Sequence, residues 1–144
     1  MIAEAKPRDI DEIHRIFKLV DKNAWGRQTL EDAFENENCF FLVLKQENKT
    51  LGFAAVMLAL DEAELLYIAV DPHFYGRGFG KSLLAAVLGR AKEKGASSMY
   101  LEVRLSNHAA VSLYENFGFK KSASRRGYYQ NPSEDALVMV LTSF

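Results

Sequence analysis

The sequence predicts one α/β domain over residues 1–144, with a mixed, mostly antiparallel sheet flanked by helices. Apolar runs of strand length alternate along the chain with segments whose apolar residues recur at helical spacing. The central strand, Leu65 to Val70, is followed by a glycine-rich turn, a long helix and a further strand, Met99 to Arg104. A helical crossover of this length joins parallel strands, so these two strands are predicted to run parallel.

The segment before the central strand predicts a short strand, two helices and a hairpin. Ile2 to Ala5 can form the short strand, and Pro7 suits the first turn of a helix whose apolar residues are Ile10, Ile13, Ile16, Phe17 and Val20. A shorter helical pattern follows Trp25, which is predicted to be a packing anchor. The apolar runs Cys39 to Leu44 and Leu51 to Leu60 are separated by a polar turn, which predicts an antiparallel hairpin.

The segment after the central strand predicts two helices with defined ends. The long helix is followed by Gly95, and the next helix begins after Asn107, a good N-cap, and ends at Gly118. In the strand between these helices the side chains alternate, so Glu102 faces away from the apolar residues Leu101 and Val103.

Two more strands are predicted at the end of the chain, Phe119 to Ala123 and Ala136 to Leu141. Between them, Arg125 to Glu134 reads R-R-G-Y-Y-Q-N-P-S-E. This stretch is predicted to be the only sizeable loop, and its polar and aromatic residues make it a candidate binding segment.

The glycine-rich turn, Tyr75 to Gly80, predicts a binding site for a phosphorylated ligand. Gly76, Gly78 and Gly80 lack a Cβ, so the backbone amides can turn inward toward a phosphate, and the helix that opens near Phe79 adds the partial positive charge of its N-terminus. The spacing misses both the P-loop and the dinucleotide-binding fingerprint by one residue.

Composition excludes several other classes of protein. The chain is 49% hydrophobic with a net charge of −1, which argues against the broad basic surface of a nucleic-acid-binding protein. Its longest apolar stretch, Phe53 to Leu60, is too short to span a bilayer, and no signal sequence opens the chain. A single cysteine, Cys39, excludes an internal disulfide, and three scattered histidines do not predict a metal site. We therefore expect a cytoplasmic protein without a membrane or nucleic-acid partner.

Two motifs resemble the GNAT superfamily of N-acetyltransferases. The pattern V-x-P followed by [RQ]-x-x-G-x-[GA] fits Val70, Pro72, Gly78 and Gly80, with Tyr75 in place of the usual Arg or Gln. It is similar to the motif by which that superfamily binds the pyrophosphate of acetyl-coenzyme A. The stretch that begins at Asn107 is similar to the second signature of the superfamily, N-x-x-A-x-x-L-Y-x-x-x-G-F.

Within that superfamily, the chain is most similar to the RimI group of bacterial ribosomal-protein-alanine N-acetyltransferases. The similarity spans Asp61 to Leu141 and includes D-E-A-E-L-L-Y-I-A-V-D-P, L-E-V-R-x-S-N, L-Y-E-x-x-G-F and R-R-x-Y-Y. It implies acetylation of the N-terminal alanine of a small-subunit ribosomal protein by direct attack of the amine on the thioester. It also implies that Glu102 accepts a proton and that Tyr114 donates one to the departing thiolate.

The resemblance further implies the GNAT fold, in which a splay between the central parallel strands admits the pantetheine arm. The residues implied to bind acetyl-coenzyme A are Ile68, Ala69 and Val70 at the thioester, Tyr75, Gly76, Arg77, Gly78, Phe79 and Gly80 at the pyrophosphate, and Asn107 at the pantetheine. The residues implied to line the acceptor groove are Leu65, Leu66, Tyr67, Tyr128 and Tyr129.

Each of these roles has an alternative. An amine with a pKa near 8 is mostly protonated at pH 7 and benefits from a base, yet Glu102 could instead form a surface salt bridge with Arg104. Tyr114 could be a packed aromatic residue, and Asn107 a plain helix cap. The enzyme could act on lysine side chains or small amines, or the protein could be a non-catalytic acyl-coenzyme A-binding module. The oligomeric state is left open.

Overall fold

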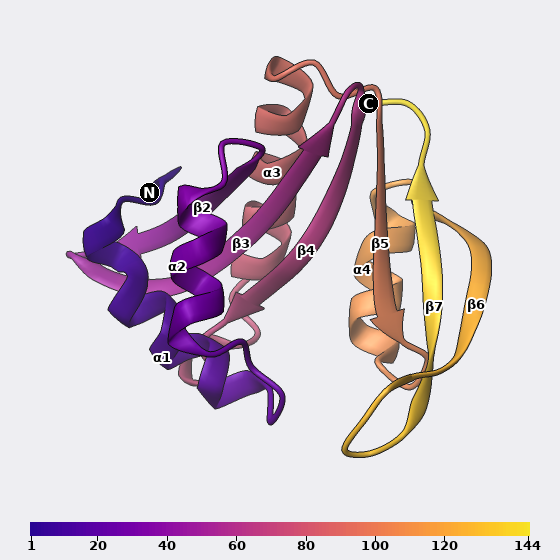
Figure 1. The fold of residues 1–144 in the computed structure, drawn as a ribbon, viewed down its shortest axis with the longest axis horizontal. Coiled ribbons are helices and arrows are strands. Elements are labelled where there is room, and N and C mark those ends of the chain that lie inside the picture. Colours follow the sequence, from indigo (N-terminus) through magenta and orange to yellow (C-terminus); the bar gives the residue numbers. More distant parts are fainter.

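The computed structural model describes residues 1–144 and contains one seven-stranded sheet with helices on both faces (Figure 1). The strands are β1 (Ile2–Glu4), β2 (Cys39–Gln46), β3 (Lys49–Ala59), β4 (Glu62–Val70), β5 (Ser98–Arg104), β6 (Lys120–Tyr129) and β7 (Glu134–Leu141). The helices are α1 (Ile10–Val20), α2 (Arg27–Glu35), α3 (Phe79–Glu93) and α4 (His108–Asn116), with short 3-10 turns at Pro7–Asp9 and Pro72–Phe74.

The sheet has the order β1-β2-β3-β4-β5-β7-β6. Only β4 and β5 are parallel neighbours, and every other adjacent pair is antiparallel. The predicted mixed, mostly antiparallel sheet is therefore confirmed, as is the crossover through α3 that makes the central pair parallel.

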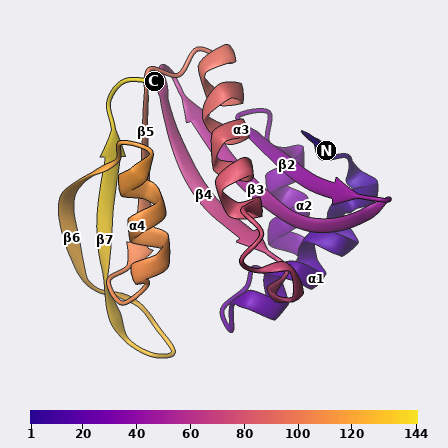
Figure 2. The same cartoon turned by 180° about the vertical axis from the view of Figure 1, so that it is seen from behind.

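Helices cover the two faces of the sheet separately. α1 and α2 lie on one face, and α3 and α4 lie on the other, where they stand in front of the strands when the molecule is seen from behind (Figure 2). Ile13, Ile16 and Phe17 of α1 are buried on the first face, and the ring centroid of Trp25 lies 5.5 Å from that of Phe17. Trp25 is thus a packing anchor, as predicted. Burial of these apolar surfaces is the main favourable term that holds the helices to the sheet.

The central parallel strands separate along their length. Their pairing runs only from Glu62 opposite Ser98 to Leu65 opposite Leu101. Beyond that point β4 and β5 diverge, as Figure 1 shows. The register between β3 and β4 shifts at Leu66, so a bulge bends β4 where its pairing with β5 stops. This is the splay that the resemblance implies, and it leaves the β5-facing backbone groups of Leu66 to Val70 without a partner strand.

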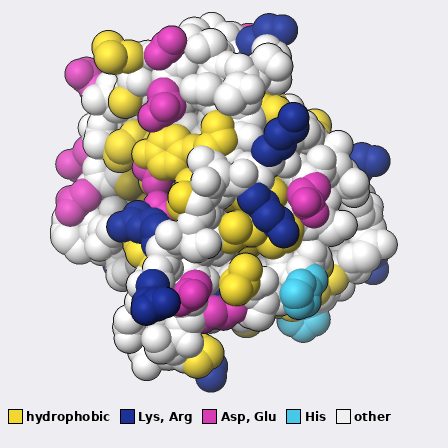
Figure 3. Space-filling view, turned by 90° about the vertical axis from the view of Figure 1, so that its right-hand side faces the viewer, with side chains coloured by type: hydrophobic (Ala, Val, Ile, Leu, Met, Phe, Trp, Pro, Cys, Tyr) yellow, Lys and Arg dark blue, Asp and Glu magenta, His cyan; other side chains and the backbone are white.

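The predicted loop from Arg125 to Glu134 is wrong. β6 continues through Tyr129, and only residues 130–133 form the turn to β7. The strand survives there because Arg125 pairs with Ala136 and Tyr129 with Glu134, on either side of an irregularity in the register. Its polar residues suit a sheet edge, where charged side chains discourage pairing with another chain, rather than a loop. Lys and Arg side chains are spread over the face to which this edge belongs (Figure 3).

No helix combines the length and the apolar character needed to cross a membrane.

Candidate active site

A cavity of about 1150 Å³ occupies the splay between β4 and β5. It is lined by the end of α1 and the α1–α2 loop, by β4, by the glycine-rich turn, and by β5, α4 and the β6–β7 turn. Every site residue that the sequence predicts lines it except Arg77. The Arg77 guanidinium lies instead over the ring of Phe74, 5.3 Å from its centroid. Segments far apart in the sequence therefore converge on one space.

The phosphate loop, Tyr75 to Gly80, presents free backbone donors to this cavity. Gly76 and Gly78 both have φ of +79°, a left-handed conformation that residues with a Cβ rarely adopt. The N–H groups of residues 76–78 donate to no backbone carbonyl, and α3 begins directly after them at Phe79, so its first-turn N–H groups are free as well. Loop amides and helix N-terminus together form a cradle suited to an anion such as a pyrophosphate.

A buried carboxylate fixes the start of this loop. Asp71 is 2% exposed, and its carboxylate accepts hydrogen bonds from the backbone and ring of His73 and from Arg15 on α1. Burial alone would raise the pKa of Asp71, but the hydrogen bonds from His73 and Arg15 outweigh it and lower the pKa below its ordinary value. The ionised carboxylate thus ties β4, the turn that follows it and α1 together.

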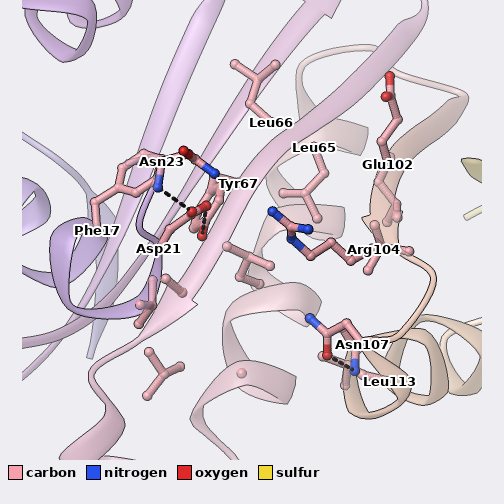
Figure 4. A pocket seen from close by; sticks show the side chains of 18 of the residues that line it. Phe17, Asp21, Asn23, Leu65, Leu66, Tyr67, Glu102, Arg104, Asn107 and Leu113 are labelled. Carbon is pink, nitrogen blue, oxygen red and sulfur yellow. Dashed lines mark hydrogen bonds between the residues drawn. The ribbon is translucent and has the colours of Figure 1, made fainter. Parts of the chain in front are cut away.

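Glu102 projects from β5 with one carboxylate oxygen bonded and one free. Its Oε1 accepts a hydrogen bond of 2.9 Å from Arg125, whereas its Oε2 is buried without a hydrogen-bond partner. The alternative pairing of Glu102 with Arg104 is wrong. Arg104 bonds the backbone oxygens of residues 130 and 132 and the carboxylate of Glu134, and the two side chains point in different directions (Figure 4). Glu102 and Arg104 each bond to residues of the neighbouring β6–β7 hairpin and not to each other.

Tyr114 reaches the cavity from the buried face of α4. Its side chain packs edge-on to Phe119, with ring centroids 5.7 Å apart. Burial raises the pKa of the Tyr114 phenol well above its ordinary value, and the nearby Tyr129 phenol adds to the shift. A phenol with a raised pKa stays protonated at neutral pH and can act as a proton donor.

Asn107 caps α4 and also lines the cavity. Its Oδ1 accepts a hydrogen bond of 3.2 Å from the Ala110 amide, as predicted for an N-cap. The cap uses only the carbonyl end of the side chain, so its Nδ2 group is available to donate to a ligand (Figure 4).

Two tyrosines from the end of β6 form one wall of the cavity. The rings of Tyr128 and Tyr129 lie 5.0 Å apart at 78°, and each is covered by an arginine, Tyr128 by Arg125 at 4.3 Å and Tyr129 by Arg104 at 4.6 Å. Burial, with the charge of Glu102 second, raises the pKa of Tyr129 to about 12. Both phenols are therefore neutral at pH 7, and the charges at this wall are those of the arginines that cover the rings.

The opposite wall comes from β4. Leu65 and Leu66 line it together with Tyr67, whose hydroxyl donates a hydrogen bond of 2.8 Å to Asp21 at the end of α1. Burial and then this hydrogen bond raise the pKa of Tyr67. The resemblance placed these β4 residues beside the acceptor, and the structure sets them across the cavity from Tyr128 and Tyr129.

Several residues line the cavity although the sequence did not predict them there. Among them are Asp21, Asn23 and Arg104. Asp21 and Asn23 lie in a polar segment with no motif, and they reach the cavity only because α1 packs on β4. Arg104 was considered only as a partner for Glu102. No spacing pattern within the sequence links Asn23 or Arg104 to the β6–β7 turn, where both donate to the carbonyl of Gln130.

The chain belongs to the acetyltransferase (GNAT) family, whose model matches residues 9–119. This family uses acetyl-coenzyme A as its co-substrate. The chain is 34% identical over 142 residues to the ribosomal protein bS18-alanine N-acetyltransferase of Escherichia coli K12, covering 97% of this chain and 95% of that protein. It is 37% identical over 142 residues to the enzyme of the same name from Haemophilus influenzae, covering 96% of each. The crystal structure of the Escherichia coli ribosomal-protein-S18-alanine N-acetyltransferase superposes with a TM-score of 0.93 at 33% identity, covering 100% of this chain and 94% of that one.

Proposed function

We propose that this protein transfers the acetyl group of acetyl-coenzyme A to the N-terminal alanine of ribosomal protein bS18, in the cytoplasm. The names and the extent of the bacterial relatives support the substrate. The observation that carries the reaction is the buried, unbonded Oε2 of Glu102, in the same cavity as a backbone cradle for an anion. A buried carboxylate oxygen without a partner is costly, and an amine N–H is the donor that would satisfy it.

Each group of site residues has its own role in the proposed transfer. The phosphate loop holds the pyrophosphate, and Asn107 donates to the pantetheine arm. Glu102 takes a proton from the acceptor amine, whose nitrogen forms the new bond to the acetyl carbon. The β5-facing backbone N–H groups between residues 66 and 70 donate to the carbonyl oxygen as it gains charge. Tyr114 gives its proton to the sulfur as the carbon–sulfur bond breaks, and no covalent bond to the enzyme forms.

An α-amine suits this site better than a lysine side chain. An α-amine with a pKa near 8 costs about 1 kcal/mol to deprotonate at pH 7, whereas a lysine with a pKa near 10.4 costs about 4 to 5 kcal/mol. A carboxylate is a weak base, so it can supply the smaller of these energies more readily. The other carboxylates that line the cavity, Glu64 and Asp21, each already accept a hydrogen bond from a tyrosine hydroxyl, so Glu102 is the one with a buried oxygen that has no partner.

Mass spectrometry of an acetylated peptide tests the proposal. The peptide carries the bS18 amino terminus with its free alanine and internal lysines, and a matched peptide with the alanine amine already blocked serves as the control. We expect one acetyl group on the free peptide, located at the α-amine, and none on the blocked peptide. Acetyl groups confined to lysine would overturn the proposal in favour of a lysine acetyltransferase.

A further inference from the structure

The two strands that the splay separates are reconnected at the acceptor end by a chain of hydrogen bonds. From β4, the Tyr67 hydroxyl donates to Asp21 Oδ2, and the other carboxylate oxygen of Asp21 accepts from the backbone N–H of Asn23 (Figure 4). Asn23 Nδ2 then donates to the carbonyl of Gln130 at 2.8 Å, and Arg104 of β5 donates to that same carbonyl at 2.9 Å. We call this chain of five residues the acceptor bridge.

The Gln130 carbonyl joins the two halves of the acceptor bridge, because it accepts one hydrogen bond from Asn23 and one from Arg104. On the β5 side the attachment is strong. The Arg104 guanidinium also bonds the Pro132 carbonyl and Glu134 and covers the ring of Tyr129. Charge-assisted bonds of this kind are roughly twice as strong as bonds between neutral groups.

On the other side the attachment depends on one neutral residue. The Asn23 side chain makes two hydrogen bonds to the turn. Its Nδ2 group donates to the Gln130 carbonyl, and its Oδ1 accepts a bond of 3.3 Å from the Nδ2 group of Asn131. Asn23, Gln130 and Asn131 all line the cavity, and both bonds are exposed to solvent. Asn23 is therefore the weakest link of the acceptor bridge, and the one whose loss would free the turn without disturbing the hydrogen bonds of Arg104.

We propose that Asn23 is a positioning residue that sets the width of the acceptor end of the cavity by holding the β6–β7 turn against the α1–α2 loop. This inference rests on the proposed acetyl transfer. The bridge contacts the acceptor walls on both sides, through Tyr67 and through Tyr129, which Arg104 covers. It makes no hydrogen bond to the phosphate loop, so its effect falls on the acceptor and not on acetyl-coenzyme A.

Steady-state kinetics of Asn23→Ala with the bS18 peptide tests this role. We expect the KM for the peptide to rise about fivefold to tenfold, the effect of losing one or two neutral hydrogen bonds, with kcat within about twofold. The KM for acetyl-coenzyme A stays unchanged. Asn38→Ala, which alters an exposed asparagine whose side chain makes no hydrogen bond, is the matched control and leaves all three constants unchanged. Equal rises in both KM values, or no rise for the peptide, would overturn the proposal.

A double-mutant cycle shows whether the contact itself is responsible. Asn131 has φ of +52°, so glycine can replace it without strain while removing the donor to Asn23. Asn131→Gly alone should raise the peptide KM less than Asn23→Ala, and the double variant should be no worse than Asn23→Ala, because that bond is already absent. Fully additive effects would contradict a direct contact between the two residues.

Hydrogen exchange separates the failure of this inference from the failure of the proposed function. In Asn23→Ala without any substrate, the amides of the β6–β7 turn should exchange faster than in the unmodified protein, while those of the phosphate loop exchange at the same rate. This readout does not depend on which amine is acetylated. Unchanged exchange in the turn would overturn the acceptor bridge even if the bS18 peptide proves to be a substrate.

Discussion

The coenzyme side and the acceptor side of the cavity are built in different ways. The proposed pyrophosphate site on the coenzyme side comes from one continuous stretch, Tyr75 to Gly80, and the groups that it offers to a ligand are backbone amides. The acceptor side is assembled from β4, the α1–α2 loop, β5, the end of β6 and the β6–β7 turn, and it is lined mainly by side chains. Asn23 and Gln130, which meet there, are 107 residues apart.

This difference predicts which changes each side tolerates. A cradle of backbone amides depends on φ and ψ, so side chains can vary where the glycines cannot. A wall of side chains held by hydrogen bonds depends on the identity of each residue. Activity should therefore be lost through side-chain changes on β5 and α4, and coenzyme affinity through backbone changes in the phosphate loop.

The largest effect is expected for Glu102→Gln. General bases contribute roughly 10²- to 10⁴-fold, so kcat at pH 7 should fall by that order. The loss should shrink as pH rises, because a growing fraction of the acceptor amine loses its proton without help. A pH–rate profile measures both. Glu37→Gln, an exposed glutamate before β2, is the control. A profile identical to that of the unmodified enzyme would leave Glu102 only its structural bond to Arg125.

Tyr114→Phe should lower kcat by about 10²-fold, near the low end for a general acid, because a thiolate is a good leaving group. The raised pKa of Tyr114 keeps its proton bound as pH increases, so the unmodified enzyme should lose no activity through this group up to the ordinary tyrosine pKa of about 10. Calorimetry should show unchanged affinity for coenzyme A. A variant with full kcat would mean that Tyr114 serves only to pack against Phe119.

Gly78→Ala tests whether coenzyme A binding depends on the backbone conformation of the phosphate loop. A Cβ on Gly78 would meet no atom within 4 Å, so the expected loss comes from its φ of +79° and not from a clash. Forcing alanine into this region costs about 1 to 2 kcal/mol, which should weaken coenzyme A binding about tenfold in a calorimetric titration. Gly89→Ala is the matched control. It also meets no atom, but it lies inside α3, where alanine should raise the free energy of unfolding by about 0.5 to 1 kcal/mol. Equal affinity in both variants would show that the loop conformation does not matter for binding.

The same contrast explains what the sequence could predict. The strand, turn and helix from Leu65 to Ala91 are local, so periodicity and glycine spacing were enough to place them, and the splay followed from the family resemblance. The β4 bulge at Leu66 left no trace in the sequence, because it arises from the register with β3. The predicted strand ended before Arg125 because Arg125 to Tyr129 are mostly polar. Pairing with β7 is what makes them part of β6.

The acceptor side shows the limit most clearly. Tyr128 and Tyr129 were predicted from a motif, whereas the arginines that cover them and the link from Asn23 to the β6–β7 turn depend on tertiary packing. Strand alternation placed Glu102 on the polar face, yet the only partner considered for it, in the alternative to a catalytic role, was Arg104, whereas its partner in the structure is Arg125. Alternation fixes which face a side chain occupies, but the neighbouring strand decides what it contacts.

Tyr75→Gln should have the smallest effect. Tyr75 is 61% exposed and stands where related motifs have Arg or Gln, so the substitution should change stability little and leave coenzyme A affinity equal or up to about twofold better. The physical reason is that the donors which the loop offers are backbone N–H groups, and a glutamine amide would add one more donor at its edge. Calorimetry with coenzyme A measures the effect, and Tyr75→Phe separates the ring from the hydroxyl. A loss in Tyr75→Gln that Tyr75→Phe does not share would show that the aromatic ring contacts the coenzyme, and the pyrophosphate site would then depend on a side chain as well as on backbone amides.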